Sequence, residues 1–122
     1  MLTRRGFGLG LLFAVLVGSQ ALAHHGWRWT EEGKFELTGL ITSVRLGNPH
    51  GELRVDAEGE EWLVEVGQPW RNERAGLSDE LLTEGTEITV FGGRSADPAE
   101  KRVKATSVRI DGREYVLYPN RD

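Results

Sequence analysis

The sequence holds three histidines, and their positions suit nitrogen coordination of a metal ion. His24 and His25 follow directly after Ala21-Leu22-Ala23, and His50 lies in the segment Asn48-Pro49-His50-Gly51. Cleavage after Ala23 would make His24 the first residue, so that its α-amine and imidazole Nδ1 could chelate one metal ion together. A second imidazole from His50 would complete a three-nitrogen set of the type called a histidine brace. Nitrogen donors in a planar array favour Cu(II) over Ni(II) and Zn(II), which are the alternatives.

His25 and Glu65 are further candidates for the same metal site. His25 could replace His50 as the second imidazole or add a fourth nitrogen. Glu65 is a possible carboxylate ligand, or a partner that orients a ligand, and the alternation of its strand directs it away from the core. Cleavage after Ala21 would make His24 the third residue. The amine, two amides and that imidazole would then form another square-planar chelate for Cu(II) or Ni(II).

Trp27 and Trp29 come directly after the histidine pair. They could line a binding surface, but packing against a small barrel is the stronger expectation because such a domain has few other large side chains. Docked on the barrel, the two rings would hold His24 near His50. A competing interpretation is that the histidine pair forms a solvated tail and that His50 only bonds within an ordinary Asn-Pro turn.

The composition excludes several other kinds of site. The absence of cysteine removes disulfides, zinc–thiolate sites, iron–sulfur clusters and cysteine nucleophiles. The only methionine is Met1, so thioether ligation of Cu(I) is excluded from an exported chain. A formal net charge of −4 argues against a nucleic-acid partner. No nucleophile stands beside a base in a recognisable pattern, and an enzyme is therefore not the expectation.

Residues 1–23 have the features of a cleaved export signal. Arg4 and Arg5 precede the apolar run Leu9–Val17, and a small-x-small cleavage site follows. The run is too short to span a bilayer comfortably, so we expect no membrane span after cleavage; an uncleaved tether is the alternative. Thr3-Arg4-Arg5-Gly6-Phe7 also resembles the twin-arginine motif. Either route leads to the periplasm or out of the cell.

Residues 24–122 are expected to form one all-β domain. Alternating apolar residues predict strands over Lys34–Leu46, around Leu53 and Val55, over Trp62–Val66, Glu87–Phe91 and Val103–Ile110, and over Glu114–Tyr118. In the first strand the apolar phase changes from Phe35 and Leu37 to Leu40 and Val44, which predicts a bulge or sharp bend at Gly39.

The connections between these strands have equally clear signals. Pro69 predicts the first turn of a short helix that ends near Gly76, and Ser78–Leu82 predicts a second helical turn capped by Ser78. The segment Gly92–Lys101 is expected to be a polar loop, and Asp111-Gly112 predicts a two-residue hairpin turn.

The order of these elements is that of a small OB-like Greek-key barrel. Such a barrel has five or six strands and a short helical connection between strands three and four. A plain six-stranded meander barrel is the alternative.

A set of short motifs resembles a family of small exported bacterial proteins of unassigned function. Family members typically read HHS, LTGTVT, NPH, W-x-x-E-x-x-x-P and GDxVTVxG in that order. The matching segments here are His24-His25, Leu37-Thr38-Gly39, Asn48-Pro49-His50, Trp62–Glu65, Gly67-Gln68-Pro69 and Gly85–Gly92. The resemblance implies an OB-like periplasmic barrel in which the histidine pair and the NPH turn belong to one recurring site. Gly26, Gly51 and Trp70-Arg71-Asn72 depart from the family pattern.

Together these features predict a periplasmic or secreted metal-binding protein. Copper is the expected metal, bound by His24, His25 and His50, and the expected role is copper sequestration, delivery or tolerance. The alternative is a metal-free binding module that holds a peptide, a glycan or a partner protein of an exported complex.

Overall fold

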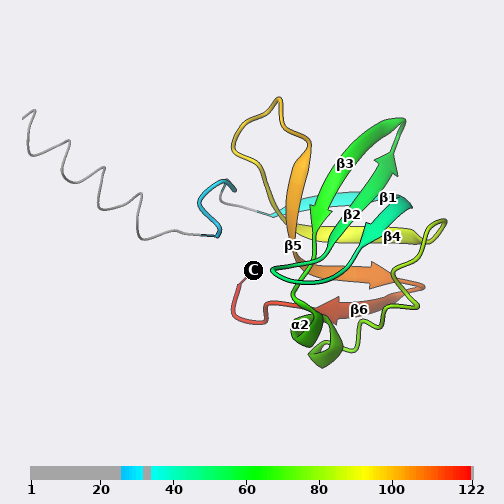
Figure 1. Cartoon of the computed structure of the whole chain (residues 1–122). Coiled ribbons are helices and arrows are strands. Elements are labelled where there is room, and N and C mark those ends of the chain that lie inside the picture. The colour runs from blue at the N-terminus through cyan, green and yellow to red at the C-terminus, as the bar shows by residue number, and fades with distance from the viewer. Residues whose placement is uncertain (1–25, 32–33, 122) are drawn as a thin grey trace, which may run out of the picture.

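The computed structural model describes residues 26–31 and 34–121. The strands in this part are β1 (Phe35–Arg45), β2 (Glu52–Ala57), β3 (Glu60–Glu65), β4 (Glu87–Arg94), β5 (Arg102–Ile110) and β6 (Arg113–Val116). A short helix, α2 (Pro69–Arg74), connects β3 to β4. Figure 1 shows α2 at the lower end of the barrel.

The strands form a closed five-stranded barrel with one additional strand. The sheet order is β3-β2-β1-β4-β5-β6, and a parallel pairing of β3 with β5 closes the barrel. Because β1 pairs with both β2 and β4, the topology is not a meander. The expected OB-like fold with a helix between strands three and four is confirmed.

The core is made of apolar side chains that all strands contribute. These residues lie between Leu37 and Leu117, and most of them are almost completely inaccessible to water. Trp62 belongs to this core and packs against the ring of Phe35, with a centroid distance of 5.2 Å. All core residues of the described part of the chain lie after His24.

The first strand differs from the sequence prediction in the position of its irregularity. Ile41 is buried and Leu40 is 49% exposed, so the inward phase of Leu37 continues past Gly39. The register shift lies between Ile41 and Ser43. Of the bulge or sharp bend predicted at Gly39, the bulge is therefore wrong, because it lies two to four residues later. That glycine serves close packing, because an added Cβ would collide with the carbonyl oxygen of Asp56.

Strand β4 is longer than expected, since it continues through two glycines to Arg94. The predicted loop Gly92–Lys101 therefore begins too early, because Gly92, Gly93 and Arg94 belong to β4. A Cβ at Gly92 would overlap the carbonyl group of Lys104 on β5, so the glycine allows close approach of the strands. Glycines that read as loop residues in a sequence are here the sites of closest strand contact.

Two turns test the remaining local predictions. Ser78–Leu82 forms two consecutive hydrogen-bonded turns and no α-helix, with Leu81 N–H donating to Ser78 O and Leu82 N–H donating to Asp79 O. The hairpin at Asp111 and Gly112 is confirmed, and both residues have positive φ angles of 51° and 76°.

None of the helices among the described residues has the length and apolarity needed to cross a membrane.

Replacing Gly39 with alanine should destabilise the barrel, because the new methyl group meets backbone that cannot move away without breaking strand pairing. Overpacking of this kind costs about 1–3 kcal/mol of unfolding free energy. The neighbouring Leu40→Ala removes a half-exposed side chain and serves as the control, with a loss below about 1 kcal/mol. Urea unfolding measures both variants, and equal stability of the two would contradict the close-packing role.

Candidate functional site

A buried carboxylate lies at the seam where the barrel closes. Glu65 is the last residue of β3 and only 2% exposed, although its side chain points away from the apolar core. The parallel pairing of β3 with β5 sets Glu65 opposite Lys104. Its Oε2 accepts a hydrogen bond from Arg102 Nη2 at 2.6 Å, and its Oε1 lies 3.5 Å from Lys104 Nζ. Two cations on one strand thus compensate one buried anion on its neighbour.

His50 stands next to this carboxylate. It lies in the connection from β1 to β2, two residues before β2 begins, and its side chain is 27% exposed. Its Nε2 lies 3.6 Å from Glu65 Oε1, while its Nδ1 lies 3.3 Å from the carbonyl oxygen of Gly51. A Cβ on Gly51 would press on Val66 and Leu46, so a glycine here allows the His50 turn to pack on the end of β3.

The segment 26–31, which we call the N-terminal strap, lies along the outside of the same seam. Glu31 N–H donates to Arg94 O, and Ala96 N–H donates to Trp29 O, each at 2.9 Å. At the strap's first residue, the carbonyl oxygen of Gly26 accepts a hydrogen bond of 3.1 Å from Lys104 Nζ. The lysine that neutralises Glu65 therefore also anchors the start of the strap.

Both strap tryptophans cover the cations of the seam. The guanidinium of Arg102 lies 4.0 Å from the ring centroid of Trp29, and Lys104 Nζ lies 4.7 Å from that of Trp27. These rings limit the access of water to the cations, which strengthens their interaction with Glu65. The two tryptophans are half-buried on the outer surface and do not enter the barrel core.

The histidine candidates from the sequence fall into two groups. His24 and His25 lie outside the described residues, while His50 and Glu65 are brought together. Within residues 26–31 and 34–121, no cluster of three or more His, Asp or Glu side chains has an arrangement that could hold a metal ion. A metal centre of three or more such side chains at His50 would therefore need donors from outside the described residues, where His24 and His25 lie.

The sequence reading missed Arg102 and Lys104 as parts of this site. Their exposed side-chain fractions are 28% and 12%, so they are not ordinary solvated charges. The alternation of β5 shows only that Arg102 and Lys104 share its outward face, because they are two residues apart and Val103 between them is buried. What was missing is the parallel register that sets this outward row beside Glu65.

Two pKa shifts reflect the electrostatics of the surroundings. The ring of Tyr118 packs edge-on against Trp27, with a centroid distance of 5.2 Å. Burial raises the pKa of Tyr118, and the negative charge of Glu65 raises it further. The positive charges of Arg71 and Arg121 act in the opposite direction. The hydrogen bond from Arg45 lowers the pKa of Glu52.

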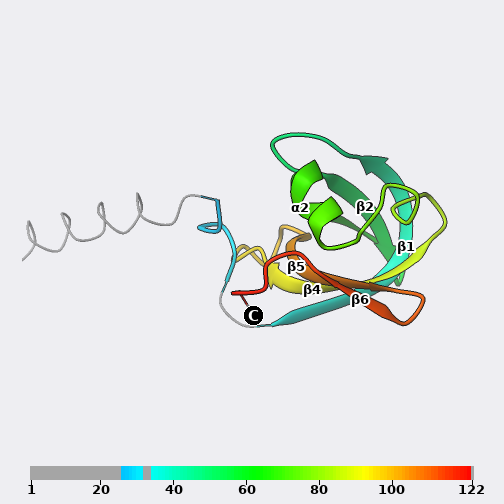
Figure 2. The ribbon, with the colours of Figure 1, turned by 90° about the horizontal axis from the view of Figure 1, so that it is seen from below.

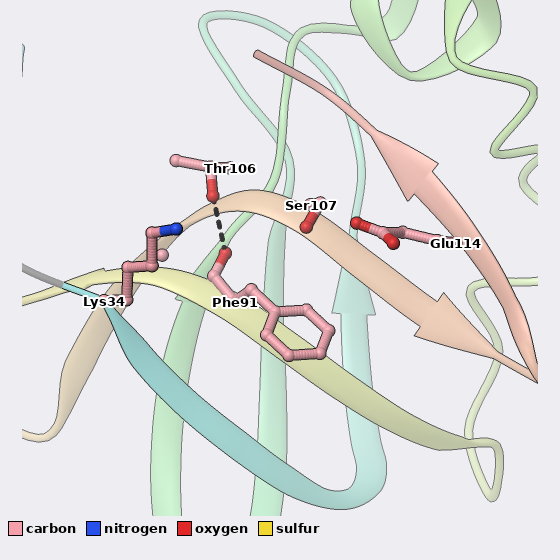
Figure 3. A pocket seen from close by; sticks show the side chains of 6 residues that line it. Lys34, Phe91, Thr106, Ser107 and Glu114 are labelled. Carbon is pink, nitrogen blue, oxygen red and sulfur yellow. Dashed lines mark hydrogen bonds between the residues drawn. The ribbon is translucent and has the colours of Figure 1, made fainter. Parts of the chain in front are cut away.

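A separate pocket lies on the outer face of the sheet, away from the His50 seam. Figure 3 shows the side chains of Lys34 and Glu114 at opposite ends of this pocket, with the ring of Phe91 between them. Its volume is about 200 Å³, and the hydroxyl of Thr106 donates to Phe91 O beside it. It shares no lining residue with the Glu65 cluster, and its size would admit only a small ligand.

The chain belongs to a family of unknown function, DUF6152, whose sequence profile matches residues 13–103. No curated protein sequence matches the chain significantly. The family membership accordingly brings no established activity, and the function has to be argued from the residues of the site.

Several solved structures contain a similar barrel. One, from the S. pombe Stn1–Ten1 complex, has a TM-score of 0.51 at 18% identity and covers 63% of this chain and 57% of that chain. TiaS in complex with agmatine gives 0.53 at 16% identity, over 73% of this chain and 27% of that one. Yeast Stn1 and Ten1 give 0.50 at 14%, over 63% and 42%. This chain thus spans part of each relative, and the likeness shows the OB fold alone.

Substituting Glu65 with glutamine should destabilise the fold, since Arg102 and Lys104 would then face each other without a counter-charge. Removing one partner of a buried ion pair costs about 3–5 kcal/mol, and the partial exposure of both cations lowers this to about 2 kcal/mol. Glu61→Gln, on the same strand, breaks an exposed pair with Arg54 and should cost less than about 1 kcal/mol. Thermal unfolding compares them, and a Glu65→Gln protein as stable as Glu61→Gln would refute this account of the seam.

Proposed function

We propose that this protein is a periplasmic Cu(II)-binding protein that acts in copper sequestration, delivery or tolerance. The proposed donors are the α-amine and imidazole of His24, after cleavage at Ala23, and the imidazole of His50, with His25 as an additional nitrogen. Ni(II) and Zn(II) are the alternative metals for the same nitrogen set.

The observation that carries the proposal is the anchoring of Gly26, the residue directly after the histidine pair. Three contacts link its carbonyl oxygen to His50 through Lys104 and Glu65, and each is 3.6 Å or shorter. Consecutive Cα atoms are about 3.8 Å apart, so His25 and His24 are attached within one and two such steps of this anchor. This short attachment supports the proposal that their side chains and the new α-amine bind the same metal ion as His50.

The hydrogen bonding of His50 supports a role as a ligand. The carbonyl oxygen of Gly51 can only accept, so the Nδ1 contact is a hydrogen bond when Nδ1 carries the proton. A neutral His50 then presents the lone pair of Nε2, and a backbone carbonyl bound to the other nitrogen is the usual second partner of a metal-binding histidine. Metal ion and proton would compete for this nitrogen.

The charges of the seam favour neutral nitrogen donors over a carboxylate. Arg102 and Lys104 already engage the oxygens of Glu65, so the cluster of these three residues carries a net positive charge. A carboxylate that already contacts two cationic side chains attracts a metal ion only weakly. We therefore assign Glu65 the role of holding Lys104, and through this lysine the start of the strap, close to His50. Nitrogen-rich binding without a carboxylate is a preference of Cu(II) among divalent ions.

Titrating Cu(II) into the protein that begins at His24 should give one-to-one binding and a nitrogen-rich EPR spectrum. One extra glycine before His24 removes the chelating α-amine, and His50→Ala removes the distant imidazole. Each change should weaken binding at least about tenfold, which corresponds to 1.4 kcal/mol of binding free energy. Glu52→Gln, a neighbour of the His50 turn that supplies no donor, is the control.

Binding that survives both the extension and His50→Ala would place copper on the histidine pair alone and contradict a shared site. No binding above that of a short His-His peptide would favour the metal-free alternative. Stronger binding of Zn(II) or Ni(II) than of Cu(II) in the same assay would replace copper as the metal.

Trp27→Ala tests whether strap docking prepares the metal site. The substitution removes the contacts of this ring with Lys104 and Tyr118 but changes no charge and no proposed donor. Loss of preorganisation should weaken Cu(II) affinity by roughly tenfold, because the histidine pair must then be ordered on binding. Trp70→Ala, which removes an exposed ring on α2, should leave the affinity unchanged. Equal affinities of the two variants in calorimetry would argue against the anchoring role.

A further inference from the structure

The pocket on the outer face of the sheet, which we call the outer-sheet pocket, is built from four separate parts of the chain. Figure 2 shows three of them, the strands β4, β5 and β6, next to one another. The fourth is the residue directly before β1. The lining residues are Lys34 before β1, Phe91 and Gly92 on β4, Thr106 and Ser107 on β5, and Glu114 on β6.

A bulge between β4 and β5 supplies the hydroxyl groups of this pocket. Phe91 pairs with Ser107, and Gly92 pairs with Ala105. Thr106 is therefore an extra residue without a partner on β4, and bulges of this kind redirect side chains. The hydroxyl of Thr106 donates to Phe91 O at 3.1 Å, which leaves its oxygen as an acceptor. Ser107 is only 8% exposed and adds a hydroxyl that can donate.

Opposite charges mark the two ends of the outer-sheet pocket. Figure 3 shows Lys34 at one end and Glu114 at the other, with the ring of Phe91 between them. None of the ion pairs within residues 26–31 and 34–121 involves Lys34 or Glu114. A cation and an anion held apart by an apolar ring are complementary to a ligand that carries one charge of each sign at its two ends.

The charges on the sheet face around Phe91 balance each other. Cross-strand pairing places Glu36 beside Phe91 and Arg109 beside Glu114, and directly opposite residues share a face of the sheet. The guanidinium of Arg109 lies 5.2 Å from the centroid of the Phe91 ring. With Lys34 and Glu114, these side chains amount to two cations and two anions. Such a face favours a ligand without net charge over an anion or a cation.

We propose that the outer-sheet pocket binds a small zwitterion of dipeptide size, with its carboxylate at Lys34 and its ammonium at Glu114. The cavity of about 200 Å³ is smaller than the sites of drug-sized ligands, which take about 300–1,000 Å³. A free α-amino acid carries both charges on one carbon, which is too short a spacing to place them on either side of a phenyl ring.

A dipeptide meets these requirements because its termini are separated by a peptide group. Two extended residues span up to about 7 Å. The carbonyl oxygen of the peptide group can accept from the Ser107 hydroxyl, and its N–H can donate to the oxygen of Thr106. Small side chains would pack on the ring of Phe91. The pocket shares no residue with the proposed copper site, so this proposal does not depend on metal binding.

The test titrates alanyl-alanine into the metal-free protein that begins at His24 and follows backbone amide signals by NMR. The signals of Gly92, Thr106 and Ser107 should shift to saturation, while Gly59, in the turn between β2 and β3, should not move. N-acetylation removes the ammonium of the probe, and C-terminal amidation removes its carboxylate. Each blocked form should bind about fivefold more weakly, the effect of one exposed ion pair. Free alanine should also bind more weakly.

Two variants assign the two ends of the ligand. Glu114→Gln should bind the free and the acetylated dipeptide equally well, because the partner of the ammonium is gone, but it should still prefer the free form over the amide. Lys34→Met should show the reverse pattern. A merely structural effect of either substitution would weaken all three ligands alike, and that result would overturn the proposal.

The matched controls are Arg113→Gln and Lys101→Met. Arg113 is next to Glu114 on β6 but lies over Tyr115, and Lys101 pairs with Glu60, so neither lines the pocket. Both should discriminate between the three ligands as the unaltered protein does. No shift of the pocket signals, or equal binding of the free and blocked dipeptides by the unaltered protein, would refute the proposal. A protein that binds Cu(II) but no dipeptide would refute this proposal alone.

Discussion

A single buried carboxylate organises the outside of this barrel. Glu65 lies at the end of β3, where the parallel pairing with β5 closes the barrel, and its burial demands compensation by nearby donors. Arg102 and Lys104 supply this compensation from β5. The ion pairs of Glu65 with these two cations add a polar contact to the β3–β5 pairing. The same contact places His50 and the N-terminal strap beside each other.

The strap depends on this seam through the cations that face Glu65. Trp29 covers Arg102, and Trp27 covers Lys104, whose ammonium also holds the carbonyl oxygen of Gly26. Each cation therefore has a carboxylate beneath it and an aromatic ring above it. This arrangement makes the entry point of the chain a defined position on the barrel. A histidine pair directly before that point is what turns an outer surface into a proposed metal centre.

The fold was largely predictable from the sequence, whereas the site was predictable only in part. The alternation in β2, β3 and β5 identified strands, and Asp111-Gly112 identified the hairpin, because these signals are local. The predictions at Gly39 and Gly92 were wrong because each glycine allows close contact with another strand, and the neighbouring residues in the sequence do not reveal that contact. His50 and Glu65 could be named as candidates from residue type. The partners Arg102 and Lys104 could not, because they meet Glu65 only through a parallel pairing between residues 37 or more positions apart.

The most direct test of a shared copper site is paramagnetic broadening in the heteronuclear NMR spectrum of the protein that begins at His24. Substoichiometric Cu(II) should broaden the signals of His50 and Gly51 together with those of Gly26 and Trp27, because one ion would lie near all four residues. The hairpin at Gly112 should stay sharp. Broadening confined to the N-terminal residues, with His50 unaffected, would contradict the central claim that the seam brings the histidines into one site.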